Sequence, residues 1–142
     1  MEPDVLNYID PSRETFSVFK ALPRDTPIRM LNLIKFREVA AYPKGHDCAI
    51  SGWSGREAYA AYHDAIAPIL ARVGAEMAWS GAFECVVTGP ADWPWDATFV
   101  MGYPDAAAFL AMVTDAEYKR AVVHRQAAVE DSRLVRFGVQ VG

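Results

Sequence analysis

The chain alternates between short apolar runs typical of β-strands and longer segments whose apolar residues recur at helical spacing. Residues 28–36, "IRMLNLIKF", have the period of two that a strand requires. One face of this strand would carry Met30, Asn32, Ile34 and Phe36, and the other Leu31, Leu33 and Lys35. Both faces are largely apolar, so the pattern predicts a strand that is covered on both sides.

Two segments have the signals of helices. Residues 54–57, "SGRE", match the capping box, and apolar side chains then recur every three or four residues up to Gly74, a residue type that often ends helices. A second helical segment follows Asp105 as its predicted cap. Residues 114–117, "TDAE", form another capping box, so we expect a new helix there that continues to about Glu130.

Three further runs read as strands. Residues 75–89 predict one long strand, with Met77 and Trp79 on the same face, and residues 97–103 predict the next. The proline-containing turn between these two runs predicts a hairpin. Residues 133–141 close the chain as a strand in which Val135, Phe137, Val139 and Val141 share one face.

The chain begins with a segment that we expect to form a helical arm. Asp10 and Pro11 have the pattern of a cap and first turn, and the helix should stop before Pro23. We therefore divide the chain into an N-terminal helical arm, residues 1–26, and a single domain, residues 27–142. Within that domain, residues 37–53 have little periodicity and form a connection longer than structure alone usually needs, which favours a lid.

The predicted order of strand, helix, strand, strand, helix, strand is that of an α+β, ferredoxin-like βαββαβ fold. This fold has a four-stranded antiparallel sheet with both long helices on one face. The second face is also largely apolar, although a solvated antiparallel sheet normally alternates apolar and polar residues. A two-fold interface is a common way to cover such a face, so we expect a homodimer that packs through its sheet faces.

Composition narrows the class of protein. The 142 residues contain 14 Lys and Arg against 18 Asp and Glu, and no basic stripe is interleaved with aromatic residues, so no nucleic-acid partner is expected. No apolar run approaches a membrane span, and the acidic N-terminus lacks the pattern of a signal peptide, so we expect a cytoplasmic protein without membrane contact. Cys48 and Cys85 lack the spacing of a zinc site.

Several stretches together resemble a known family. They are "MLNLIKF", "SGREAYAAY", "WDATFVMGYPDAAAFLAMVTDAEY" and "HRQAAVEDSRL", and they resemble the domain-of-unknown-function family 1330, within the dimeric α+β barrel superfamily, over residues 28–137. The resemblance implies a ferredoxin-like protomer and a barrel-like dimer. That superfamily includes cofactor-free monooxygenases, isomerases and haem-binding peroxidases, so the resemblance implies no single activity.

Arg125 is the first candidate site residue. In the helix predicted to continue to about Glu130, Arg125 and Tyr118 lie on the same apolar stripe. This places a guanidinium on the helix face that should be buried. A buried guanidinium needs an anion. Two interpretations stay open: a protein carboxylate such as Asp96 or Asp131, or the carboxylate or enolate oxygen of a ligand.

Four more residues complete the candidate site. Asn32 would donate a hydrogen bond to a ligand carbonyl, or would be satisfied by a neighbouring strand. His63 and His124 are candidates for a general base that removes a proton next to a carbonyl, or are ordinary surface residues. We prefer His63 because Tyr59 and Tyr62 precede it and supply walls for a pocket.

These residues support a first hypothesis, a small-molecule-binding homodimer that acts on a carbonyl or carboxylate metabolite as a cofactor-free oxygenase or isomerase. Catalysis is left open, and no cofactor is expected. A rival is a non-catalytic structural dimer in which Arg125 is part of an ion pair. Haem binding is a third possibility, although no histidine has a distinctive context. Residues 45–48, "GHDC", lack the spacing of a preformed metal site.

Overall fold

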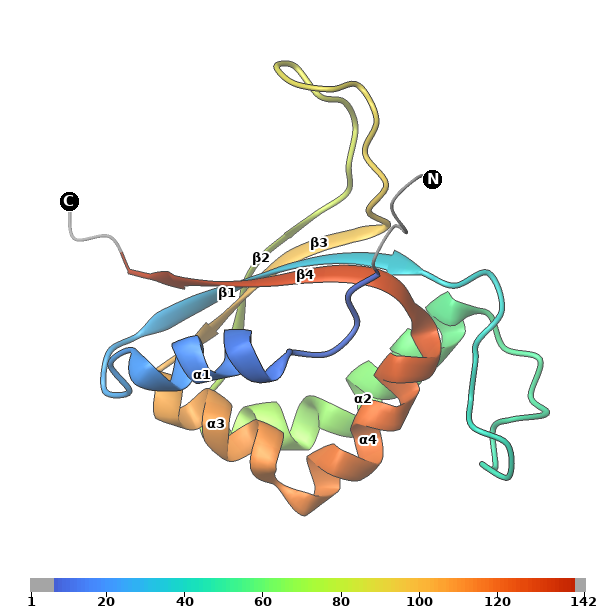
Figure 1. The fold of residues 1–142 in the computed structure, drawn as a ribbon, viewed down its shortest axis with the longest axis horizontal. Helices are drawn as coiled ribbons and strands as arrows, with labels where there is room; N and C mark the ends of the chain where they lie inside the picture. The colour runs from blue at the N-terminus through green and yellow to red at the C-terminus, as the bar shows by residue number, and fades with distance from the viewer. Residues whose placement is uncertain (1–6, 140–142) are drawn as a thin grey trace.

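A computed structural model describes residues 7–139 as one antiparallel sheet with helices on one side (Figure 1). The strands of the sheet are ordered β2-β3-β1-β4. They comprise β1 (Ile28–Phe36), β2 (Glu76–Gly81), β3 (Ala97–Tyr103) and β4 (Val129–Gly138). The helices are α1 (Arg13–Ala21), α2 (Gly55–Val73), α3 (Ala106–Thr114) and α4 (Ala116–Ala128). The predicted ferredoxin-like α+β fold, with an additional N-terminal helix, is confirmed.

Strand β1 lies inside the sheet, between β3 and β4. Its side chains alternate between the two faces of the sheet, as the sequence pattern predicts. Met30 and Ile34 are buried beneath the helices, and Asn32 lies between them on the same face. Leu31 and Leu33 point to the other face and are only half-buried. We call the face beneath the helices the inner face and the opposite one the outer face.

The ends of the helices show why these segments are helical. Ser54 and Glu57 form the predicted capping box of α2, and Gly74 ends that helix in the left-handed conformation. The cap of α1 is Ser12 instead of Asp10, because the Ser12 hydroxyl accepts a hydrogen bond from the N–H of Thr15.

The boundaries of α4 also differ from the prediction. Asp115 caps this helix, and the predicted "TDAE" box does not form because Thr114 is the last residue of α3. The helix ends at Ala128 instead of Glu130, since the chain enters β4 at Val129.

The second strand is shorter than predicted. It ends at Gly81, and residues 82–96 extend away from the sheet on the side opposite the helices (Figure 1). A bulge between Met77 and Trp79 shifts the register, so that Met77 pairs with Met101 and Trp79 with Val100. The prediction that Met77 and Trp79 share a face is therefore wrong.

The outer face of the sheet carries exposed apolar side chains. Trp79 is 55% exposed and Phe137 is 51% exposed, and Val135 and Val139 are also exposed. Val141, which was predicted to share their face, lies outside the described residues. No helix of residues 7–139 covers this face (Figure 1).

Residues 37–53 pack against the C-terminal end of α4. The N–H groups of Arg37 and Ala41 donate to the carbonyls of Ala128 and Ala127. Within residues 7–139, no helix has the length and apolar character needed to cross a membrane. The cytoplasmic location and the boundary between arm and domain at residue 26 stay predictions.

Candidate functional site

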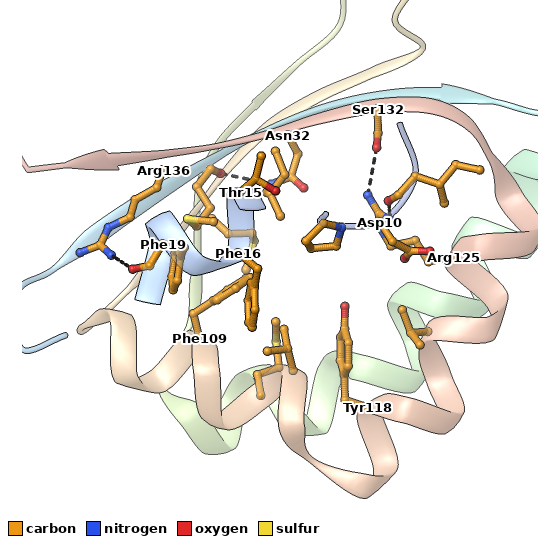
Figure 2. Close-up of a pocket in the computed structure, with 18 of the residues that line it drawn as sticks. Asp10, Thr15, Phe16, Phe19, Asn32, Phe109, Tyr118, Arg125, Ser132 and Arg136 are labelled. Atoms are coloured by element: carbon orange, nitrogen blue, oxygen red, sulfur yellow. Dashed lines mark hydrogen bonds between the residues drawn. The ribbon is translucent and has the colours of Figure 1, made fainter. Parts of the chain in front are cut away.

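A cavity of about 890 Å³ lies between the inner face of the sheet and the helices (Figure 2). Its walls come from β1, β3 and β4 on one side, from α2, α3 and α4 on the other, and from the segment that contains α1. Ligand sites in proteins commonly have volumes of roughly 300–1,000 Å³. The cavity is therefore large enough for a small metabolite.

Six of the seven residues that the sequence suggests for a site line this one cavity, and His124 is the exception. They come from β1, α2 and α4, and they are Asn32, Tyr59, Tyr62, His63, Tyr118 and Arg125. Their functional roles stay predictions, but the fold brings them together.

Arg125 lies in the last turn of α4 and is only 8% exposed. Its Nη1 donates a hydrogen bond to the carbonyl of Ile9, and its Nη2 donates to the hydroxyl of Ser132 over 3.3 Å. The remaining N–H groups of the guanidinium, that of Nε among them, donate to no described residue. Figure 2 shows the guanidinium at one end of the cavity, beside Asp10 and Ser132.

Neither carboxylate that we had considered as a partner is paired with Arg125. Asp131 forms an ion pair with Arg133 over 2.8 Å, and Asp96 accepts a hydrogen bond from the N–H of Phe36. Residues 7–139 contain three ion pairs, and Arg125 is in none of them. The interpretation of Arg125 as part of an ion pair with Asp96 or Asp131 is therefore wrong.

Three tyrosine hydroxyls lie near the guanidinium. Burial raises the pKa of Tyr59 to about 12 and that of Tyr62 well above its ordinary value, and the positive charge of Arg125 offsets part of each rise. Burial also raises the pKa of Tyr118, although the hydrogen bond from Tyr62 and the charge of Arg125 oppose it. The hydroxyls of Tyr62 and Tyr118 are 3.1 Å apart. At neutral pH all three phenols keep their protons, so this end of the cavity is rich in hydrogen-bond donors.

Asn32 projects from β1 into the same space (Figure 2). Its Nδ2 donates to the carbonyl of Met30 over 3.1 Å, so part of the amide is satisfied within its own strand. Its other N–H and its Oδ1 bond to no described residue. The amide can therefore offer one donor and one acceptor to a ligand.

The two candidate bases lie in different places. His63 is at an exposed margin of the cavity, on α2. His124 does not line it: its Nδ1 is 2.6 Å from the hydroxyl of Tyr42, and its ring lies edge-on to that of His46. Burial and the neighbouring His46 lower the pKa of His124. Of the two, only His63 can reach a ligand in the cavity.

The opposite end of the cavity is apolar. Figure 2 shows Phe16, Phe19 and Phe109 grouped at this end. The rings of Phe19 and Phe109 lie 5.0 Å apart. Met101 and Met112 complete this part of the wall.

Residues 7–22 of the N-terminal arm form much of the wall of the cavity. The sequence did not predict this. The main chain of the arm is attached to β4. The hydroxyl of Ser132 donates to the carbonyl of Tyr8 over 2.7 Å, and the N–H of Tyr8 donates to Asp131 over 2.8 Å. The only sequence signal for this packing was the pair Phe16 and Phe19 on one side of the arm helix.

Residues 37–53 line no part of the cavity, so the prediction of a lid is wrong for this site. Their aromatic side chains are occupied elsewhere, since Tyr42 stacks on His46 and bonds to His124. Within the described part of the chain, no three His, Cys, Asp or Glu side chains gather as metal ligands would.

Comparison with known proteins identifies the family. The model of the domain of unknown function DUF1330 matches residues 52–138, which is more than half of the chain. The chain belongs to the DUF1330 family. The matched part of this DUF1330 protein contains Tyr59, Tyr62, His63, Tyr118 and Arg125, whereas Asn32 and the arm lie before it.

Solved structures similar to this DUF1330 protein include a protein of unknown function from Rhodopseudomonas palustris. It is 44% identical, with 96% of this chain and 100% of that chain covered and a TM-score of 0.86. A structure of the methylated form of that protein is 46% identical, covers 95% and 96% of the two chains and has a TM-score of 0.86.

A more distant similarity is to a protein of unknown function from Bacteroides fragilis, described as dimeric and ferredoxin-like. It is 12% identical over 82% of this chain and 100% of that chain, with a TM-score of 0.47. No protein with a curated description matches this chain.

Proposed function

We propose that this protein binds a small, partly apolar metabolite with a carboxylate or carbonyl group in the cavity of each protomer of a homodimer. Arg125 anchors the anionic oxygen, Asn32 orients a carbonyl, and Tyr59, Tyr62 and Tyr118 surround the polar end. The observation that carries this proposal is a buried guanidinium that faces a cavity of about 890 Å³ and pairs with no described carboxylate.

Electrostatics favour an anionic ligand. A buried charge without an opposite charge is unfavourable, and removing one partner of a buried ion pair typically costs about 3–5 kcal/mol. The groups that bond to Arg125, the carbonyl of Ile9 and the hydroxyl of Ser132, are neutral acceptors. Asp10 lies beside the guanidinium but accepts from Gln126 and forms no ion pair with Arg125. A carboxylate or enolate can supply the missing charge, and the planar guanidinium suits a bidentate contact.

His63 is the group that we assign to chemistry, if the ligand is transformed. Its ring lies at the margin of the cavity that holds Arg125 and Asn32. An imidazole there can remove a proton next to a carbonyl while Arg125 stabilises the resulting enolate. This is the first step that a cofactor-free oxygenase or an isomerase requires.

The homodimer is supported by the outer face of the sheet. Trp79, Val135 and Phe137 are exposed there and lie over half-buried Leu31 and Leu33. Large apolar patches on proteins usually mark an interface, and a two-fold axis lets one patch cover its own copy. The rival, a structural dimer without a ligand site, depended on an ion pair of Arg125 that is not found among the described residues.

The proposal is tested by a thermal-shift screen with small carboxylates, phenols and quinones on the wild type and on Arg125→Met. Methionine keeps the apolar stem and removes the charge. A ligand at roughly 100 times its Kd stabilises by about 2.7 kcal/mol, which raises the Tm of a domain of this size by roughly 5–10 °C. We expect such a rise for the wild type and little or none for Arg125→Met.

Arg56→Met is the matched control, because Arg56 stacks on Phe36 and does not line the cavity. It should keep the ligand response of the wild type. The proposal is wrong if no compound stabilises the wild type, or if Arg125→Met responds to the same compounds to the same extent.

A further inference from the structure

The cavity is polar at one end and apolar at the other, and the arm contributes to both ends. At the polar end, Asp10 of the arm lies beside Arg125, and its carboxylate is held by Gln126. At the apolar end, Phe16 and Phe19 of α1 pack against Phe109 of α3, and the three rings form one wall. A ligand that fills the cavity would therefore contact the arm from one end of the cavity to the other.

The arm is held by hydrogen bonds from two arginines and by the packing of its phenylalanines. Arg125 donates to the carbonyl of Ile9, and Arg136 donates to the carbonyls of Phe19 and Pro23. Helix α1 contains no fully buried residue. Phe16 and Phe19 are only half-buried; both pack against the hydrophobic core and both line the cavity. A ligand in the cavity would therefore touch the same rings that hold the arm in place.

Arg125 connects the arm to the place where an anion would bind. Some of its N–H groups hold Ile9 and Ser132, while the others are directed at no described residue. A carboxylate that accepts from these other groups would share one guanidinium with the arm. Binding would then order the arm, because the charged contact fixes the side chain that holds Ile9.

We propose that the arm closes the site over a ligand that is a monocarboxylate with an apolar body. The carboxylate takes the remaining donors of Arg125, and the body lies against the apolar wall that Phe16, Phe19 and Phe109 form together. This inference rests on the proposed function, to which it adds the class of ligand and the part played by the arm.

Octanoate is the test ligand, and octanamide is its uncharged match. Calorimetric titration of the wild type should show saturable binding of octanoate and binding of octanamide at least about tenfold weaker, a difference of about 1.4 kcal/mol. Phe16→Ala and Phe19→Ala should each weaken octanoate binding by roughly five- to tenfold, since each removes part of the apolar wall.

Phe83→Ala is the control for these variants. Phe83 is 47% exposed, more than the half-buried arm phenylalanines, and stacks on Trp93, outside the cavity. Its substitution should leave the affinity for octanoate unchanged. Phe16→Leu serves as a further variant if Phe16→Ala does not fold, and it should retain most of the binding.

A second measurement needs no substitution. Hydrogen exchange of residues 8–22 in the wild type should slow when octanoate is added, and should not slow with the same concentration of octanamide. If octanoate binds and requires Arg125, but the two alanine variants bind normally and exchange in the arm does not change, the role of the arm is wrong while the proposed function stands. If octanamide binds as tightly as octanoate, the assignment of a carboxylate is wrong. If the wild type binds no carboxylate, both the inference and the proposed function fail.

Discussion

Gly55, the first residue of α2, shows how single positions shape the wall beside the site. A Cβ atom at Gly55 would lie 2.3 Å from the carbonyl oxygen of Arg37 and 2.6 Å from that of Ala128. Both neighbours are main-chain atoms, which cannot turn aside as a side chain can. The absence of a side chain therefore lets α2 approach the junction between α4 and β4, directly after Arg125.

Gly55→Ala should consequently destabilise the protein by about 1–3 kcal/mol, as overpacking typically does. Urea unfolding measures the change. Gly138→Ala is the matched control, because a Cβ at Gly138 meets nothing within 4 Å, and its effect should stay within about 0.5 kcal/mol. Equal stability of Gly55→Ala and the wild type would show that the neighbouring main chain shifts to make room for the methyl group.

Residue patterns located the candidate site only in part. Arg125 stood out because its charge falls on an apolar helical stripe, and Tyr59 and Tyr62 because they lie at helical spacing from each other just before His63. Ser132 and Asp10 gave no such signal. Their place at the cavity depends on the path of the arm across β4, which joins residues more than 100 positions apart.

At the scale of elements, local signals predicted most of the fold. The capping box at Ser54 and the glycine at the end of α2 are contained within a few residues, as is the alternation in β1, and all three are confirmed. Neither the bulge after Met77 nor the end of β2 at Gly81 was predictable, because apolar residues continue through both positions. For the place of the arm at the cavity the sequence offered only the pair Phe16 and Phe19.

The attachment of the arm to β4 predicts a pH dependence. Although partial burial raises the pKa of Asp131, the hydrogen bonds from the N–H of Tyr8 and from Arg133 lower it below its ordinary value of 3.8. A carboxylate whose pKa is lower in the folded state stabilises that state above its unfolded pKa. The contribution is lost as the pH falls through the folded pKa.

Wild type should therefore be more stable than Asp131→Asn at pH 6, and the difference should shrink as the pH falls below about 3.8. Urea unfolding of both proteins from pH 6 to pH 2 measures it. A difference that is constant over this range would mean that the Asp131 contacts do not depend on its charge.

In the whole molecule, we assign ligand binding to the inner face of the sheet and dimer formation to the outer face. The inner face lines the cavity with Asn32, and the outer face exposes the apolar residues that we assign to a second copy. Residues 82–96 rise on the outer side, where that copy would lie (Figure 1).

Val135→Lys should convert the proposed dimer to a monomer, because a two-fold axis would bring two unpaired ammonium groups into an apolar interface. Sedimentation velocity at micromolar concentration distinguishes the two states. Ile50→Lys is the control: Ile50 is 95% exposed in the 37–53 segment, and its substitution should not change the assembly. A wild type that sediments as a monomer would refute the dimer and leave the cavity unaffected.

A crystal structure of the protein with octanoate would show directly whether the cavity holds a carboxylate against Arg125. We predict a carboxylate with oxygens about 2.7–2.9 Å from the guanidinium nitrogens of Arg125 and the alkyl chain directed toward Phe16, Phe19 and Phe109. Octanoate bound outside this cavity, or bound within it with its carboxylate among the phenylalanines, would contradict the account.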